Sequence, residues 1–414
     1  MFQVDESIRS ELIELTQALI RIPSYTGEEK QLADFILDKL KEYNADEAFI
    51  DGIGNVVGVV KGTHPGPTAL LNGHLDIVPT GNVENWNGFD PFGAEIDDGG
   101  NIRGRGACDL KGGLSVQLYM MRLFQQIKNS GQPIFGNLVF TAVVYEEAAE
   151  MFGTEYLFEN TLPEKQIHCD VVFLCEPTGL KVVLGQRGKV ELVIKTFGRT
   201  AHSSRPEAGV NALEKMVPVL EYIFGPAANH MKSHELLGDS SITVTNLVCR
   251  PGTLSIIPDE CEISIDRRYM PEQDVADLMG EFEALFAKIQ ESDAEFKAEV
   301  YPRKFLETSY TGYQKEVRKF HPPWITDADH PFAVKTMSAL RMVGQTPEIN
   351  YWKFGTDGSM TAALLGIPTI GYSGTEEKYA HTPEEQVNIE MMLKSLEGYH
   401  AILSEILMKN SDKV

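Results

Sequence analysis

Histidines and carboxylates stand at the ends of several apolar runs in this sequence. The run ALLNG leads directly to His74 and Asp76, and LVFTAVVY is followed by the acidic pair Glu146-Glu147. A third run, DVVFLC, ends at Glu176. Nitrogen and oxygen ligands without sulfur suit zinc or manganese, and two metal ions need about as many ligands as the chain offers. The pattern therefore favours a site for divalent metal ions.

Two further candidates lie in less regular segments. Asp109 stands in the glycine-rich stretch IRGRGACDLKGG, which opens the helix expected over Leu114 to Ile127, and His381 follows the run IPTIGYSG. Taken singly, each has an ordinary explanation. Asp109 could cap a helix, His74 could be a hydrogen-bonded turn residue, and an acidic pair is usually a solvated strand end. Their joint occurrence on one set of strands and loops favours a common site.

The order of the expected elements predicts how these residues are positioned. Up to residue 183, short apolar runs alternate with amphipathic helices, which is typical of an α/β domain with a mostly buried sheet. Open sheets of this kind bind ligands at the carboxyl ends of their strands, so the candidates are expected to converge there. Residues 184–325 alternate apolar and polar side chains in the order β-α-β-β-α-β, which predicts a smaller, inserted split-βαβ layer. Residues 326–414 return to the first pattern.

Size and charge bound the function. A chain of 414 residues is long enough for two domains, and the net charge of −23 argues against nucleic acid or an anionic membrane as the main partner. No apolar run is long enough to span a bilayer, and the start of the chain does not have the pattern of a signal peptide. The five cysteines form no C-x-x-C pair, so a cytoplasmic protein without disulfides is expected.

Five motifs in a fixed order carry a family resemblance. GHLDIVP, GRGACDLKGG, VVYEE, CEPTG and YAHTPEE resemble the successive motifs of the M20 peptidases, which are dinuclear-zinc hydrolases. That family includes acetylornithine deacetylase, succinyl-diaminopimelate desuccinylase, aminoacylase and carboxypeptidases. The resemblance covers nearly the whole chain, and CEPTGLKVVLGQRGKVEL and SYTGYQKEVRKFHPPW look most similar to a hydrolase branch linked to selenium metabolism.

The resemblance implies a fold, a substrate class and an assembly. It implies a zinc-peptidase-like catalytic domain over residues 1–183 and 326–414, with a mixed sheet flanked by helices. Residues 184–325 would form an inserted α+β, ferredoxin-like lid and dimerisation domain. The substrate would be a small N-acyl amino acid or a dipeptide, and the protein would be a homodimer.

Metal-binding roles follow residue by residue from the same resemblance. Asp109 would bridge two divalent ions, for which zinc is the first choice and cobalt or manganese the others. His74 and Glu176 would complete the coordination of one ion. Glu147 and His381 would complete that of the other.

The resemblance also implies a general base and a residue that orients a ligand. Glu146 would be the general base, and Asp76 would accept the second N–H of His74 and thereby fix its tautomer. Neighbours on a straight strand point to opposite faces, so Glu146 and Glu147 can share one site only if the chain bends there.

Substrate contacts are implied in the inserted domain and in a late loop. His202, in GRTAHSSRPEAG, would help to stabilise the oxyanion, across the subunit boundary in dimeric members; taken alone it is a typical surface loop histidine. Ser359 stands where the desuccinylase has an arginine that holds the substrate's carboxylate, which disfavours succinyl-diaminopimelate. The other implied contacts are Arg187, Asn246, Arg268, Gly355 and Thr356.

Other classes of protein fit the sequence less well. GYSGT around Ser373 resembles a nucleophile elbow, but Thr375 replaces the required second glycine. GIGNVVG and GRGACD lack the G-x-G-x-x-G spacing of a dinucleotide-binding loop, and the metalloprotease motif H-E-x-x-H is absent from the sequence. A family member that binds ligand without catalysis is the non-enzymatic alternative. It is disfavoured because every ligand position and the base position are filled.

Overall fold

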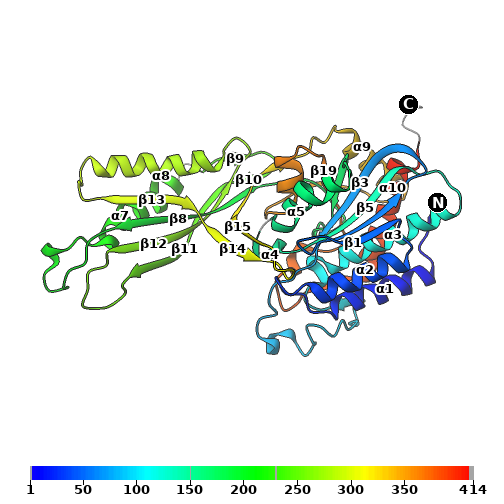
Figure 1. Ribbon diagram of the computed structural model, residues 1–414, viewed down its shortest axis with the longest axis horizontal. Coiled ribbons are helices and arrows are strands. Elements are labelled where there is room, and N and C mark those ends of the chain that lie inside the picture. The colour runs from blue at the N-terminus through cyan, green and yellow to red at the C-terminus, as the bar shows by residue number, and fades with distance from the viewer. Residues whose placement is uncertain (1, 150, 229–230, 410–414) are drawn as a thin grey trace.

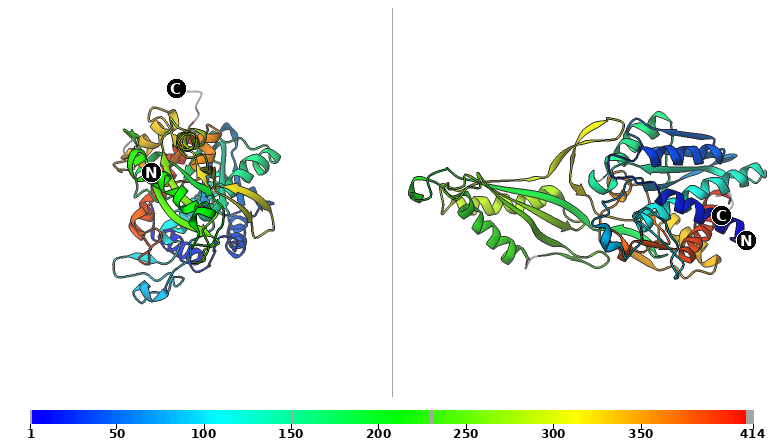
Figure 2. Two further views of the ribbon diagram at one scale, coloured as in Figure 1. Left: turned by 90° about the vertical axis from the view of Figure 1, so that its left-hand side faces the viewer. Right: turned by 90° about the horizontal axis from the view of Figure 1, so that it is seen from below.

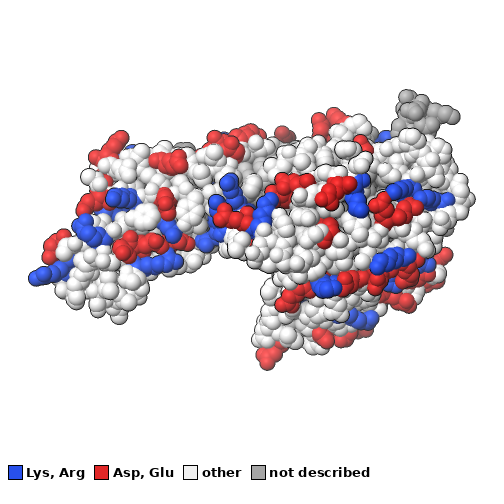
Figure 3. Space-filling view, in the orientation of Figure 1, with Lys and Arg blue, Asp and Glu red and all other residues white. Residues whose placement is uncertain are grey.

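The computed structural model describes residues 2–149, 151–228 and 231–409. The described chain forms two bodies joined end to end, and both of its ends lie on the larger body (Figure 1). Each body has its own sheet. A broad notch separates the two bodies along one side, and acidic and basic side chains are interspersed over the face shown in Figure 3.

The larger body is built on a mixed sheet of nine strands. In chain order they are β1 (Glu47–Ile50), β2 (Val56–Lys61), β3 (His64–His74), β5 (Phe135–Val143), β6 (Val171–Leu174), β7 (Val182–Gln186), β17 (Trp324–Ile325), β18 (Ile349–Trp352) and β19 (Thr369–Gly371). The order across the sheet is β1-β2-β5-β3-β6-β19-β7-β17, with β18 beside β7. The four central strands β5, β3, β6 and β19 are parallel, whereas β2 and β7 flank them antiparallel.

Two cores cover the faces of this sheet, which explains why its strands are nearly continuous apolar runs. Leu71 and Phe140 pack in one core and their neighbours Leu70 and Val139 in the other, as side-chain alternation along a strand requires. The first core is shared with the helices α1 (Glu6–Ile20), α2 (Lys30–Glu42), α3 (Gly112–Asn129), α9 (Pro331–Met342) and α10 (Ile389–Leu407). The second contains side chains from the short segments η3 (Leu157–Thr161) and α6 (Leu162–Glu164), whereas Phe152 of α5 (Phe152–Tyr156) packs in the first.

The smaller body has an antiparallel sheet with helices in its core. Its strands are β8 (Gly188–Phe197), β11 (Ser241–Arg250), β12 (Glu260–Tyr269), β13 (Lys297–Pro302) and β16 (Phe320–His321), and its helices are α7 (Ala212–Tyr222) and α8 (Val275–Gln290). The strand order β11-β12-β8-β13, with β16 beside β8, has the connectivity expected for a split-βαβ layer. Val190, Leu192 and Ile194 alternate along β8 and pack with both helices. Asp274 and Asp277 form a capping box that begins α8.

A hairpin makes a third connection between the two bodies, besides the two places where the chain crosses from one to the other. It consists of β14 (Lys304–Thr308) and β15 (Gln314–Arg318), which we call the strap (residues 304–318), and it arches from the smaller body to the larger one (Figure 2). At its tip the Tyr310 hydroxyl donates to the Gly54 carbonyl, and the Thr311 hydroxyl donates to that of Gly52, each at 2.8 Å. The strap was not predicted from the sequence.

The remaining elements are short. They are η1 (Val83–Trp86), β4 (Asn101–Arg103), the irregular turn η2 (Ala107–Lys111), α4 (Glu146–Ala149), η4 (Pro206–Ala208), η5 (Ile223–Ala227), β9 (Ser233–His234), β10 (Gly238–Asp239), η6 (Ser359–Leu364), η7 (Glu377–Tyr379) and β20 (Gln386–Asn388). None of the helices within the described part of the chain is long and apolar enough to cross a membrane.

Candidate metal centre and active site

The candidate residues meet at the carboxyl edge of the four parallel strands. β3 ends at His74, the chain beyond β5 reaches Glu146, and the chain beyond β6 reaches Glu176. These strands are neighbours and run in one direction, so their carboxyl ends lie side by side. The convergence expected from the sequence is therefore present in the structure.

A sharp bend lets two consecutive glutamates face the same site. Tyr145 adopts a left-handed backbone conformation with φ 63°, and α4 begins immediately after it. The carboxylate of Asp76 secures this bend, because its Oδ1 accepts the N–H of Glu146 at 3.0 Å and its Oδ2 accepts that of Glu147 at 3.1 Å. The hydroxyl of Thr26 also donates to Oδ2, at 2.8 Å.

Asp76 contacts His74 through a different atom from the one expected. Nδ1 of His74 lies 2.9 Å from the backbone carbonyl oxygen of Asp76, whereas the carboxylate Oδ1 is 3.6 Å away. The backbone carbonyl therefore takes the ring N–H, and Nε2 faces the cluster. The carboxylate is left to hold the Glu146-Glu147 turn, a task that no local sequence pattern indicated.

Asp109 lies between the two histidines. Its Oδ1 is 3.2 Å from Nε2 of His74, and its Oδ2 is 3.3 Å from Nε2 of His381. On the first side, Oε1 of Glu176 is 3.7 Å from the same His74 nitrogen. On the second side, Oε1 of Glu147 is 3.1 Å from His381 Nε2. One carboxylate thus offers one oxygen to each of two half-sites.

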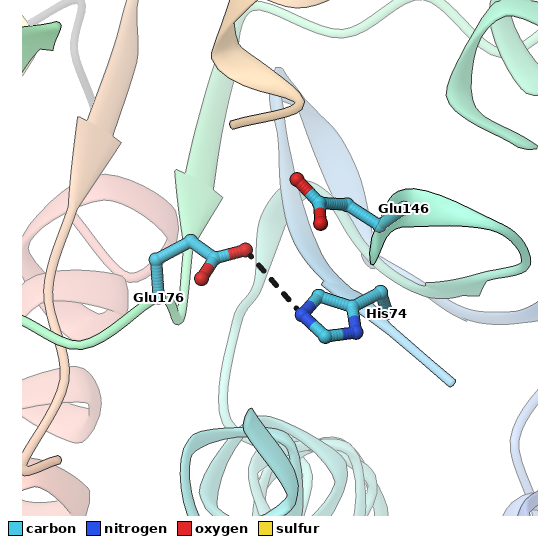
Figure 4. Close-up of side chains that lie close together, drawn as sticks. All are labelled: His74, Glu146 and Glu176. Atoms are coloured by element: carbon cyan, nitrogen blue, oxygen red, sulfur yellow. Dashed lines mark ion pairs between the residues drawn. The ribbon is translucent and has the colours of Figure 1, made fainter. Parts of the chain in front are cut away.

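These separations fit bound metal ions. Two ligand atoms at about 2.0 Å from a tetrahedral zinc ion are about 3.3 Å apart. Two groups of potential ligand atoms lie within 4.8 Å of one another, namely His74 with Glu146 and Glu176, and His74 with Asp109 and Glu147. Figure 4 shows the first group converging from β3, from the turn after β5 and from the loop after β6. The donor set of nitrogen and oxygen atoms suits a divalent ion of the zinc type.

The electrostatics of the cluster also favour a cation. Burial raises the pKa of Glu146, and the nearby charge of Glu176 raises it further. Burial would raise the pKa of Asp109 as well, but hydrogen bonds with His381 and His74 hold it below its usual range. Hydrogen bonds to Asp109 and Glu147 raise the pKa of His381 to about 10. Protons and metal ions therefore compete for the same crowded groups.

A cavity of about 440 Å³ adjoins the cluster and is lined by both bodies. This volume is within the range of small-molecule sites, roughly 300–1,000 Å³. Opposite the acidic cluster, Arg268, Lys189 and His321 line the wall from the smaller body. Lys189 on β8 lies directly across from Arg268 on β12 and from His321 on β16, so the three basic residues form one row on the same face of the sheet.

The predicted substrate-contact residues divide into those at the cavity and those away from it. Gly355 and Arg268 line the cavity, whereas Thr356 is buried and its hydroxyl donates to Gln186 Oε1 at 2.6 Å. Arg187 donates to the backbone carbonyl groups of Asp239 and Lys353. Among the described residues that line the cavity, neither His202 nor Asn246 occurs; both are exposed on the smaller body.

Several residues around the site were not identified from the sequence. Lys189 and His321 line the cavity. Beneath His74, the buried amide of Asn72 donates to Asp357 Oδ2 at 2.8 Å. Asp357 directly follows Gly355 and Thr356, which were predicted to contact substrate, and Asn72 precedes His74 by two residues on one strand face, so both had a detectable signal in the sequence. The row of basic residues through Lys189 depends on the register of three strands, and the sequence contained no signal for it.

Comparison with known proteins agrees with this geometry. The family profile of Peptidase family M20/M25/M40 matches residues 70–405. The chain belongs to this family. Its relatives include the uncharacterised protein YgeY of Escherichia coli K12, which is 30% identical over 381 residues, or 91% of this chain and 90% of YgeY.

More distant similarities are to proteins that carry the names of enzymes. Succinyl-diaminopimelate desuccinylase of Nautilia profundicola is 25% identical over 95% of this chain and 99% of its own length. The aminopeptidase PepT from Bacillus cereus has a TM-score of 0.72 at 21% identity, covering 96% of this chain and 98% of PepT, which shows the shared fold. The M20 membership and the mixed α/β fold expected from the sequence are confirmed. The protein is a metallohydrolase that acts on amide or peptide bonds.

Proposed function

We propose that this M20 enzyme releases an amine from a small N-acyl amino acid, using two zinc ions. Asp109 would be shared by the two ions, His74 and Glu176 would hold one of them, and Glu147 and His381 would hold the other. The observation that carries the proposal is the orientation of Asp109, whose two oxygens lie 3.2 and 3.3 Å from the two histidines.

Glu146 is the base in this proposal. When bound, the metal ions supply Lewis acidity, which polarises the amide carbonyl and acidifies water. Glu146 takes a proton from the attacking water and returns it to the nitrogen of the leaving amine. Its burial supports this task, because a raised pKa brings a carboxylate closer to the pKa at which it can both accept and donate a proton near neutral pH. Asp76 supports the base by holding its peptide N–H.

The basic row supports a substrate that carries a carboxylate. Arg268 lines the cavity, and its Nε and Nη2 donate to the two carboxylate oxygens of Asp266, at 2.8 Å and 3.2 Å, which holds the guanidinium in place. An oriented guanidinium suits a planar carboxylate. Both N-acyl amino acids and dipeptides have such a group, so a dipeptidase or carboxypeptidase is the second candidate from the same family. Ser359, which is buried and accepts from Gln186 at 2.7 Å, cannot replace the arginine of the desuccinylase.

A substrate screen on metal-replete protein tests the proposal. N-acetyl, N-succinyl and N-carbamoyl amino acids and dipeptides are incubated with the enzyme, and free amine is measured together with the number of bound metal ions. The expected result is two ions per chain and turnover of N-acyl amino acids. Turnover of dipeptides alone would favour the second candidate, and neither metal nor turnover would favour a binding protein without catalysis.

We also propose a homodimer formed through the smaller body. β11 is an edge strand with exposed Leu247 and Val248, and α7 exposes Leu213 and Val217. An unpaired strand edge with apolar neighbours is a surface suited to a second copy. His202 is on the same body and away from its own chain's cavity, which supports a role at the site of the partner subunit.

Mixing two inactive variants tests whether His202 acts across the dimer. Glu146→Gln and His202→Ala proteins are unfolded together and refolded, and activity is measured. If His202 acts in trans, each mixed dimer has one complete site, and random pairing restores roughly one quarter of the unaltered activity. If His202 acts within its own chain, no complete site forms, and the mixture is as inactive as its components.

A cytoplasmic location completes the proposal. All five cysteines are free thiols in the structure, including the buried Cys108 and Cys175. Free thiols are typical of proteins in a reducing compartment.

A further inference from the structure

The loop that carries Asp109 is held by a carboxylate far away in the sequence. Glu385 is fully buried, and its Oε1 accepts the N–H of Cys108 at 3.1 Å and that of Asp109 at 3.0 Å. Its other oxygen, Oε2, accepts from Nη1 of Arg105. A single side chain therefore bonds three donors from five consecutive residues, and one of the donors is the peptide group of Asp109 itself.

Backbone pairing brings the two segments into this register. β20 begins one residue after Glu385 and pairs antiparallel with β4, so that Gln386 lies opposite Arg103. The N–H of Gly104 then donates to the carbonyl of Glu385 at 3.1 Å. Glu385 also follows His381 by four residues. The same stretch of chain thus provides one histidine of the cluster and the anchor for Asp109.

Arg105 makes the anchor rigid. Its side chain is buried, and its guanidinium lies 5.2 Å from the centre of the Trp86 ring. This contact fixes the plane of the guanidinium group. Trp86 is itself held by a hydrogen bond of 2.9 Å from Nε1 to the Thr80 carbonyl. A buried carboxylate that is paired with an arginine and bonded to two peptide groups has little freedom to move.

We propose that Glu385 is a positioning residue for the metal centre, acting through the backbone of Asp109. By bonding the peptide N–H groups of Cys108 and Asp109, it sets the direction of the Asp109 side chain, so that one oxygen faces each histidine. This role rests on the proposed dinuclear site. Glu385 itself touches neither substrate nor the reacting atoms.

The variant Glu385→Gln isolates this role. Glutamine has nearly the same volume, but it replaces one acceptor oxygen with an NH₂ donor. Whichever way the amide is turned, either Arg105 or the two peptide N–H groups face another donor, and a buried donor is left unsatisfied. The neighbouring variant Glu384→Gln is the matched control, because Glu384 is exposed.

Two measurements are made on each protein before any assay. Amide hydrogen exchange of the Cys108–Asp109 segment is followed in metal-free protein, and zinc affinity is measured by competition with a chromophoric chelator. Glu385→Gln is expected to exchange faster at this segment and to bind zinc about 10–100-fold more weakly, whereas Glu384→Gln matches the unaltered chain. At saturating zinc, kcat is expected to fall and KM to stay nearly constant, because the cavity wall from the smaller body is unchanged.

The outcomes separate the inference from the proposed function. Unchanged exchange in Glu385→Gln would overturn the anchor, and faster exchange with unchanged zinc affinity would overturn the positioning role. If the unaltered chain binds no zinc, the dinuclear site itself fails, and the exchange data still report on the anchor. If Glu385→Gln does not fold, Arg105→Lys is the second variant. It keeps the Glu385 carboxylate and its hydrogen bonds from the two peptide N–H groups, but it removes the planar guanidinium. The same faster exchange and weaker zinc binding, smaller in size, are expected from it.

Discussion

A Glu146→Gln protein is expected to bind two metal ions as the unaltered chain does, yet to hydrolyse its substrate about 100–10,000-fold more slowly. Glutamine keeps the size of the side chain and cannot accept the proton of the attacking water. The turn that presents it stays in place, because Asp76 bonds the peptide N–H of residue 146 and not its side chain. Metal stoichiometry and kcat, measured on the same preparation, check this expectation.

The neighbouring residue offers a sharp comparison. Glu147→Gln changes the same chemical group one position along, but Glu147 faces His381 at 3.1 Å and is expected to be a ligand. That variant is expected to lose metal affinity first and activity as a consequence. Glu146 also lies close enough to His74 and Glu176 to reach an ion. If Glu146→Gln binds only one ion, Glu146 is a ligand and the general base has to be sought elsewhere.

Removal of the shared carboxylate is expected to have the largest effect of all. Asp109→Asn leaves the side chain nearly isosteric but removes its charge and one of its two anionic oxygens. Both half-sites lose their common ligand, so fewer than two ions are expected to remain bound. Activity is expected to fall by about 1,000-fold or more, because the metal centre supplies several kcal/mol of transition-state stabilisation. Metal analysis after dialysis, together with turnover in excess zinc, measures both effects.

The exposed Asp98 provides the control for that experiment. Asp98→Asn makes the same chemical change in a surface turn before the same glycine-rich segment, and it is expected to retain both ions and full turnover. An Asp109→Asn protein that holds two ions with unaltered affinity would show that Asp109 does not bridge them.

The parts of the site that could be predicted are those with a local cause. A buried parallel strand is a short apolar run, and its carboxyl end is where the next polar residues stand, so β3, β5 and β6 pointed to His74, Glu146 and Glu176. The bend between Glu146 and Glu147 was required by side-chain alternation and is provided by the left-handed conformation of Tyr145. The inserted layer was recognisable because its strands alternate apolar and polar residues.

What could not be predicted depends on contacts between distant segments. Glu385 and Arg105 are 280 residues apart, and only the pairing of β20 with β4 brings them together. The choice between the carbonyl and the carboxylate of Asp76 as partner of His74 is decided by distances within one turn. Neither has a periodicity or a spacing that a single sequence can display. The domain boundaries after residues 183 and 325 remain a prediction. In the structure, β7 and β17 lie at these two positions and pair with each other in the larger sheet.

The strap changes how the smaller body is mounted. If the bodies were joined only by the two chain crossings, at β7–β8 and β16–β17, these would define an axis. The smaller body could then rotate about that axis. The bonds at Gly52 and Gly54 add a third point away from that line, and three points define a plane. The strap therefore restrains this rotation, which requires the strap to bend or its hydrogen bonds to the larger body to break. The backbone carbonyl of Thr308 in the strap also accepts a hydrogen bond of 2.7 Å from the hydroxyl of Tyr145. The strap is thereby connected to the residue directly before Glu146.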